Sequence, residues 1–156
     1  QRGYTYGIGS GFSGTDAPGP FQISSGVRSN VTYEALDAIK SIVEAHGPDF
    51  DAEDLEATQS FLLRANARAF ETMGAKLGLL GSMTAYGFES DYVLQREQVV
   101  RDMTIERIQE LASDYLDPAG MIWLVVGDTR TQLPRLRALG LGEPTMLDRE
   151  GMPIGE

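Results

Sequence analysis

Residues 4–28 read YTYGIGSGFSGTDAPGPFQISSGVR, and this stretch decides the fold at the start of the chain. Aromatic, small and aliphatic side chains alternate in residues 4–12, and residues 21–28 alternate with a period of two, which is typical of β-strands. Residues 15–20 lie between them and contain Asp16, two prolines and a glycine, a composition typical of a turn. Two strands joined by a short turn predict an antiparallel hairpin.

Within this stretch, residues 9–14 read GSGFSG and match the pattern G-x-G-x-x-G. That pattern binds dinucleotides when it follows a strand and opens a helix. Residues 15–20 come next, and their prolines and glycine cannot start such a helix. We therefore interpret the glycines as part of the first strand, where missing side chains allow another backbone to approach closely.

Helices are expected to fill the middle of the chain, because apolar residues recur there with helical spacing. Asp51 is expected to cap the second helix, with Asp54 in its first turn, and Thr104 to cap the fifth. The dipeptide Gly47-Pro48 ends the first helix. The expected helices span residues 32–46, about 52–70, 75–86, 92–103 and 105–115.

Residues 121–126, MIWLVV, form a continuous apolar run bounded by Gly127 and Asp128. Such a run predicts a strand that is buried on both faces. A short helix is expected at residues 131–139. Strands at the two ends of the chain and helices between them favour an α+β fold, with helices packed on one face of a mainly antiparallel sheet of about four to six strands.

The length of 156 residues predicts a single domain over residues 1–156. The chain opens like the inside of a structure, without an initiator Met, so we expect it to be a piece of a longer chain. The strands that complete the sheet are expected to lie before Gln1 or in segments that we interpret as turns.

The chain is acidic, with 23 Asp and Glu against 13 Lys and Arg and a formal net charge of −10. This balance argues against nucleic acid and against anionic membrane surfaces as partners, because both require clustered positive charge. No run of about 18 apolar residues is present, so no membrane-spanning helix is expected. The chain contains no cysteine, which excludes disulfides and thiolate chemistry.

His46 is the only histidine in the sequence. A catalytic zinc site takes two or three histidines with a carboxylate, and a structural zinc site takes cysteines. His46 falls at the expected end of the first helix, where a side chain interacts with the last carbonyl groups. The chain alone therefore cannot assemble a zinc-hydrolase site or a Ser/Cys–His catalytic site, and we expect no metal ligand in it.

Four short motifs occur in an order that resembles the C-terminal domain of the pitrilysin/insulinase-type zinc peptidases, especially their processing-peptidase-like branch. They are RGYTY at 2–6, GPFQI at 19–23, VRDMTIE at 100–106 and VVGD at 125–128. The resemblance covers nearly the whole chain to about Asp128 and implies a LuxS/pitrilysin-like domain fold. It also implies that the zinc motif H-x-x-E-H lies in another domain or in a partner subunit.

The resemblance assigns a role to Tyr6, because that family places an Arg and a Tyr of this domain against the substrate backbone. The Arg falls before Gln1, outside the chain, and Arg2 has the wrong offset to replace it. The resemblance implies that Tyr6 assists catalysis and that Tyr6, Gly7 and Gly9 contact the substrate. A Tyr hydroxyl donates one hydrogen bond and suits developing negative charge on a carbonyl oxygen. On chemistry alone, Tyr4 and Tyr6 are ordinary strand aromatics.

The implied function is to enclose an unfolded peptide against a zinc-bearing peptidase domain or subunit. The implied partners are that zinc-bearing half and the peptide, and zinc is expected there rather than in this chain. The alternative is a structural or assembly domain of the same kind of complex, without a catalytic role. The habits of the family point to a bacterial protein of the periplasm or the cytoplasm.

Overall fold

The fold is given by a computed structural model, which describes residues 3–154. The described chain divides into two compact units, and each is described here by itself. The first comprises Gln1–Ser13, Pro20–Glu44 and Asp117–Glu156, and the second comprises Gly14–Gly19 and Ala45–Leu116.

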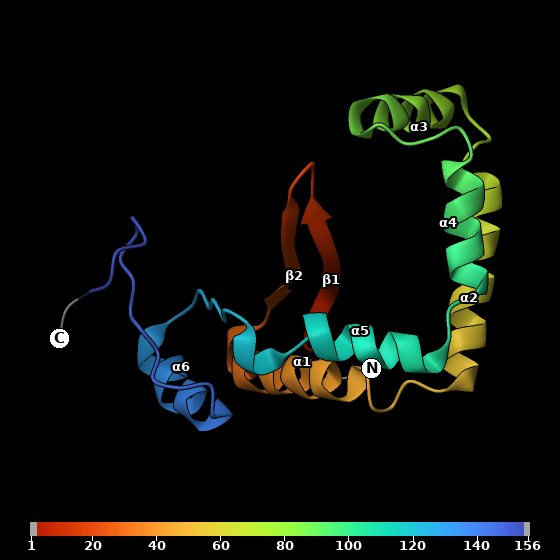
Figure 1. The fold of residues 1–156 in the computed structure, drawn as a ribbon. Helices are drawn as coiled ribbons and strands as arrows, with labels where there is room; N and C mark the ends of the chain where they lie inside the picture. The colour runs from red at the N-terminus through yellow and green to blue at the C-terminus, as the bar shows by residue number, and fades with distance from the viewer. Residues whose placement is uncertain (1–2, 155–156) are drawn as a thin grey trace. The chain divides into compact units, whose positions relative to one another are not determined.

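The hairpin predicted from residues 4–28 is present. Strands β1 (Thr5–Gly14) and β2 (Pro18–Val27) form a two-stranded antiparallel sheet (Figure 1). Its base is held by Arg28, whose backbone N–H donates to Tyr4 O at 3.3 Å and whose Nη2 donates to Gly3 O at 3.0 Å. Residues along β2 alternate between exposed and half-buried, as the period of two predicts.

Helix α1 (Thr32–His46) follows the hairpin and has the bounds that the sequence predicts. The buried apolar residues of this helix are Ala35 and Val43. Leu139, near the end of the described chain, is also buried. The predicted helix at 131–139 is found as an α-helix that continues into a 3-10 turn. The remaining elements of the first unit are η1 (Ser29–Val31), η2 (Pro118–Gly120), α6 (Thr129–Leu136) and η3 (Arg137–Leu139).

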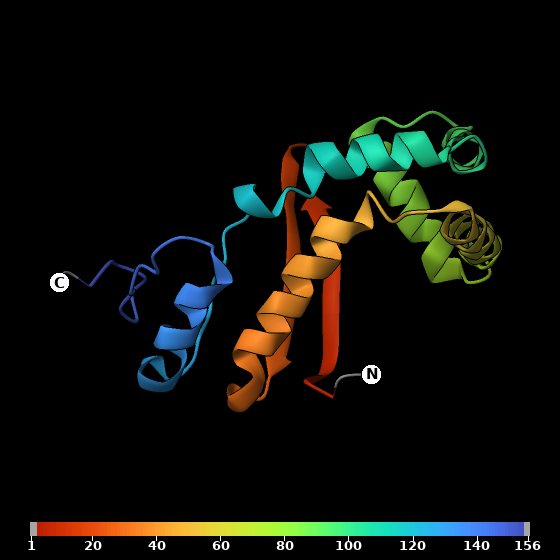
Figure 2. The ribbon, with the colours of Figure 1, turned by 90° about the horizontal axis from the view of Figure 1, so that it is seen from below.

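The second unit contains four helices, in the places that the sequence predicts. They are α2 (Ala52–Arg68), α3 (Met73–Tyr86), α4 (Tyr92–Arg101) and α5 (Ile105–Tyr115), as Figure 2 shows from below. Asp51 caps α2 by accepting from Glu53 N at 2.8 Å and Asp54 N at 3.1 Å, and the Asp54 side chain accepts from Asp51 N. This reciprocal pair is a capping box. Thr104 Oγ1 caps α5 by accepting from Arg107 N at 3.2 Å.

A single amide side chain connects α2 to the end of α4. Gln59 Nε2 lies 2.9 Å from Val100 O, 3.2 Å from Arg101 O and 3.3 Å from Met103 O, and its two protons are shared among these acceptors. The last carbonyls of a helix lack partners within the helix, so this amide supplies hydrogen bonds where they are needed. It therefore fixes the point at which α4 ends.

Helix α3 is apolar around most of its circumference, yet its large side chains are exposed. Met73, Leu77 and Leu80 are all more than half exposed. A helix that is apolar all round is normally buried in a larger protein.

No helix within residues 3–154 combines the length and the apolar character that crossing a membrane requires.

The strand predicted at residues 121–126 is wrong for the described chain. These residues belong to no strand, and Ile122 and Val126 are 97% and 94% exposed rather than buried. The sheet consequently has two strands within residues 3–154 instead of about four to six. The physical reason is the lack of a neighbouring strand there, because an apolar run becomes a buried strand only when its backbone is paired. The α+β fold class itself is confirmed.

Gly47 provides a test of how the second unit is packed. It is buried, and a Cβ at this position would lie 3.0 Å from the Cβ of Ala112 on α5. Overpacking of this kind costs about 1–3 kcal/mol. We expect Gly47→Ala to lower the free energy of unfolding by about 1 kcal/mol, measured by urea denaturation.

The matched control is the same substitution in an Ala112→Gly background, where the clash is absent. There Gly47→Ala is expected to be neutral or stabilising, because alanine restricts the unfolded chain. An equal destabilisation in both backgrounds would show that Gly47 does not pack against α5.

Candidate functional site

The residue proposed from the sequence as a substrate contact, Tyr6, is the second residue of β1 and is fully exposed. Its neighbour Tyr4 is half-buried at the base of the hairpin. The two tyrosines therefore have different surroundings, although both belong to the same alternating stretch. Exposure of the phenol leaves its hydroxyl free of any hydrogen bond within residues 3–154.

A cluster of hydroxyl and carbonyl groups holds the backbone on both sides of Tyr6. Thr5 Oγ1 lies 2.7 Å from Gly7 O and 2.8 Å from Gly26 O, and it accepts from Gly7 N–H at 3.0 Å. Ser25 Oγ from the opposite strand lies 2.9 Å from both Thr5 Oγ1 and Gly7 O. Each hydroxyl has one proton and donates to one of these oxygens at a time. The cluster fixes the backbone of residues 5–7 from both strands.

The sequence reasoning missed Thr5 and Ser25 as positioning residues. The signal that would have found them is a pair of hydroxyl residues near the two outer ends of a predicted hairpin, where cross-strand hydrogen bonds form. Their role here is to hold the strand that carries the phenol.

The glycines beside Tyr6 have open space where side chains would stand. A Cβ at Gly7, Gly9 or Gly11 would meet no atom within 4 Å among the described residues. None of the three has a positive φ, so their backbone conformation does not require glycine. Neither packing nor backbone geometry within residues 3–154 explains these glycines. A strand face that carries only glycines instead lets a second backbone approach closely.

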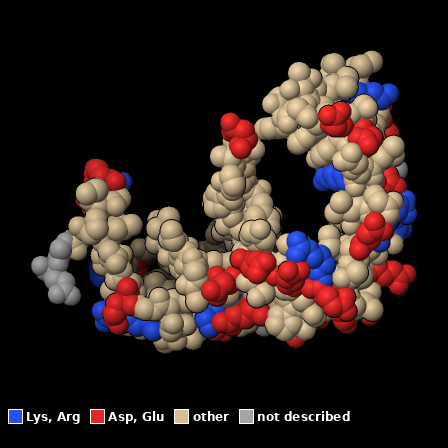
Figure 3. Space-filling view, in the orientation of Figure 1, with Lys and Arg blue, Asp and Glu red and all other residues tan. Residues whose placement is uncertain are grey.

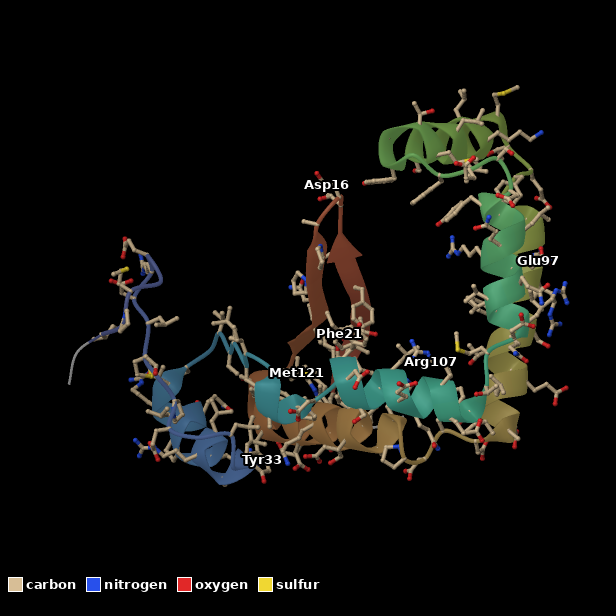
Figure 4. All side chains as sticks on the ribbon, viewed as in Figure 1. Asp16, Phe21, Tyr33, Glu97, Arg107 and Met121 are labelled. Carbon is tan, nitrogen blue, oxygen red and sulfur yellow. The ribbon has the colours of Figure 1, made fainter. Side chains whose placement is uncertain are left out.

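The second unit has an open groove with a volume of about 490 Å³. Several of its charged and amide groups already have hydrogen-bond or ion-pair partners. Gln98 Nε2 donates to Asp102 Oδ1 at 2.8 Å, and Arg107 forms an ion pair with Glu110. This lining lacks a nucleophile with an adjacent base, so it defines no catalytic centre. The groove is lined by Gln95, Gln98, Val99, Asp102, Met103 and Arg107, of which Figure 4 labels Arg107.

His46 is the last residue of α1 and is exposed, with its ring centroid 6.0 Å from that of Phe50. In the part of the chain that the structure describes, no group of three or more His, Asp or Glu side chains is placed to hold a metal ion. On the face that Figure 3 shows, acidic side chains lie at many separate places rather than in one cluster. The donor set of these residues therefore does not fit a catalytic zinc.

An ion pair of the first unit joins α6 to α1. Arg135 Nη2 lies 2.6 Å from Glu34 Oε1, and its guanidinium stands 5.0 Å from the centroid of the Tyr33 ring, which Figure 4 labels. The hydrogen bond from Arg135, followed by one from the backbone of Glu34 itself, holds the pKa of Glu34 below its ordinary value of 4.5. The same pair raises the pKa of Arg135. This exposed contact is one of the links between α6 and α1.

Comparison with known proteins supports the fold. No family model matches the sequence, and no curated protein matches it. Among solved structures, the chain is similar to the crystal structure of a peptidase M16 inactive domain from Pseudomonas fluorescens. The TM-score is 0.66 and the sequence identity 22%, and the match covers 75% of this chain and 28% of the other.

Fold and comparison together define an α+β domain that is built like an M16 inactive domain over three quarters of its length. The chain spans little more than a quarter of the neighbour's length. The likeness agrees with the resemblance seen in the sequence at the level of the fold. It does not distinguish the processing-peptidase-like branch from other branches.

The contact between Glu34 and Arg135 predicts a specific pH dependence. Because the pKa of Glu34 is lower in the folded chain than in the unfolded one, its contribution to stability is present above about pH 4.5 and is lost as the pH falls through the folded pKa. We expect Glu34→Gln to lower the urea midpoint at pH 7, and the gap from the original protein to shrink below pH 4.5.

The control is Glu56→Gln, since Glu56 is exposed on α2 and forms no ion pair within residues 3–154. It is expected to leave the midpoint unchanged at both pH values. A gap for Glu34→Gln that stays constant from pH 7 to pH 3 would contradict the role of its charge.

Proposed function

We propose that this chain is the non-catalytic, substrate-facing domain of a zinc metalloendopeptidase. It would enclose an extended peptide against a zinc-bearing half. The observation that carries the proposal is the fully exposed Tyr6 on a glycine-lined strand, in a chain built like an M16 inactive domain. A non-catalytic role also agrees with the donor set, because residues with one histidine and no cysteine cannot hold a catalytic zinc.

The proposed role of Tyr6 is to donate a hydrogen bond to the carbonyl oxygen of the peptide bond that is cut. A donor fixed in advance stabilises the charge that develops on this oxygen, and no reorganisation is needed during the reaction. The Thr5 and Ser25 hydroxyls support this role because they hold the backbone on both sides of the phenol. Zinc in the partner half would polarise the same carbonyl and activate the attacking water.

Gly7 and Gly9 are proposed to lie along the path of the peptide. The free space at their Cα atoms supports this, because a substrate backbone can pass at close range without meeting a side chain. Main-chain contacts of this type tolerate many side chains, which suits a domain that receives unfolded peptides.

The second candidate is a structural or assembly domain with no catalytic contribution. The observation that favours it is the likeness to the solved neighbour, which is an inactive domain. In this case Tyr6 would pack against a partner and its hydroxyl would be irrelevant. The two candidates therefore predict different effects on the rate of peptide cleavage when the hydroxyl oxygen of Tyr6 is removed.

That difference is measured with Tyr6→Phe in the assembly of this chain with its zinc-bearing half. We expect kcat/KM for an extended peptide to fall about tenfold or more, because one transition-state hydrogen bond is lost while the ring is kept. The control Tyr86→Phe removes a hydroxyl from α3 and is expected to leave the rate unchanged. An unchanged rate for Tyr6→Phe, at intact assembly, would favour the structural candidate.

Because the proposal places the zinc in the partner half, it predicts how this chain behaves by itself. Residues 1–156 with equimolar zinc are expected to cleave no unfolded peptide, and isothermal titration is expected to find no tight zinc site. Stoichiometric zinc together with robust peptidase activity in the purified chain would contradict the proposal. Added zinc-bearing half is expected to restore cleavage, which serves as the positive control.

A further inference from the structure

Ile8 is an exposed apolar side chain two residues after Tyr6 on β1. It is 55% exposed, and because side chains alternate between the two faces of a strand, Ile8 and Tyr6 belong to the same face. Tyr4 lies two residues before Tyr6, but it is half-buried at the base of the hairpin. Phe12, further along β1, is engaged with Phe21, with 4.9 Å between the ring centroids. Ile8 is therefore the large exposed side chain that follows Tyr6 along this strand.

The hairpin that carries Ile8 is nearly free of charge. Asp16 is the single Asp, Glu, Lys or Arg of residues 3–27, although such residues make up 23% of the chain. Asp16 lies at the tip of the hairpin, where Figure 4 labels it, so β1 itself has no charged side chain. A strand of this kind contacts a peptide through backbone hydrogen bonds and apolar side chains rather than through charge.

The spacing of Tyr6 and Ile8 matches that of an extended peptide. Alternate residues of an extended chain lie about 6.8 Å apart, both in the strand and in a peptide beside it. Side chains that face each other on two neighbouring extended chains contact each other. A peptide residue that presents its carbonyl to Tyr6 therefore places the residue two positions away beside Ile8. The peptide residue between these two turns to the other face, where β1 has Gly7 and Gly9 with open space at their Cα atoms.

We propose that Ile8 is a specificity-determining residue, which selects an apolar side chain two positions from the substrate residue whose carbonyl Tyr6 contacts. The inference rests on the proposed function, because the peptide has to pass beside Tyr6. A single exposed isoleucine is ordinary on a protein surface. Ile8 is distinguished by its place on the face of Tyr6, on a strand without charge. The substrate class is thus an extended peptide with an apolar residue at this position.

The test measures kcat/KM in the assembly of this chain with its zinc-bearing half. The peptides differ in one residue, which lies two positions before or two positions after the residue on the amino side of the cut bond. The direction of the peptide along β1 decides which of these positions lies beside Ile8. At that position, Leu is expected to be preferred over Ser about tenfold, because an apolar contact gives discrimination of this size.

The variant Ile8→Asp is expected to reverse this preference. The ratio of kcat/KM for Lys over Leu is expected to rise about tenfold or more at one of the two positions, because the carboxylate attracts the ammonium group and disfavours an apolar neighbour. At the directly adjacent peptide positions, the same ratio is expected to stay within about twofold, since those side chains turn to the other face.

The matched control is Ile42→Asp, because Ile42 on α1 is also an exposed isoleucine, at 68%. It adds the same charge and is expected to leave every ratio unchanged. A second variant, Ile8→Thr, keeps a β-branched side chain that suits a strand. It is expected to lower the preference for Leu over Ser about fivefold, because the apolar contact is reduced. Circular dichroism checks that each variant is folded.

Unchanged ratios in folded Ile8→Asp and Ile8→Thr would overturn the inference. The proposed function would still stand if Tyr6→Phe lowers kcat/KM in the same assembly. An equal change of the ratios in Ile42→Asp would also overturn the inference, because the added charge would then act without contact. A changed ratio in Ile8→Asp together with an unchanged rate in Tyr6→Phe would keep Ile8 as a peptide contact and remove the role of Tyr6.

Discussion

An extended backbone that is buried needs hydrogen-bonding partners, and within residues 3–154 two strands pair with each other along one edge each. β1 and β2 satisfy one another and are closed at their base by Arg28. Residues 121–126 have the same alternation without a partner. The paired strands give Tyr6 a fixed backbone, whereas residues 121–126 form no strand within the described chain.

The helices and the hairpin could be predicted because their signals are local. Asp51 and Asp54 lie three residues apart at the start of α2, and Thr104 precedes α5, so each cap is visible in a few letters of sequence. The spacing of apolar residues gave the bounds of α1, and the turn-forming residues between two alternating stretches gave the hairpin. These features depend on neighbours along the chain.

The features that could not be predicted depend on distant residues. Arg135 meets Glu34 across 101 positions of sequence, and Thr5 meets Ser25 across 20, without any local pattern that announces either contact. The apolar run at residues 121–126 was predicted to be a strand, and this prediction was wrong for the described chain. Its burial was wrongly predicted, because burial requires neighbours that the described residues do not supply.

The same reasoning applies to the candidate site. Tyr6, Gly7 and Gly9 were found from a resemblance, and the structure adds a phenol that is exposed and glycines that no packing explains. In the proposed function, a single tyrosine on a braced strand would position a substrate without activating water, and the zinc-bearing half would supply the activated water.

The most direct measurement is a crystal structure of the assembled peptidase with an uncleaved peptide between its halves. The account predicts that the Tyr6 hydroxyl lies within hydrogen-bonding distance, about 2.6–3.2 Å, of the carbonyl oxygen at the bond to be cut. A Tyr6 ring packed among apolar side chains, with no peptide within reach of its oxygen, would contradict it.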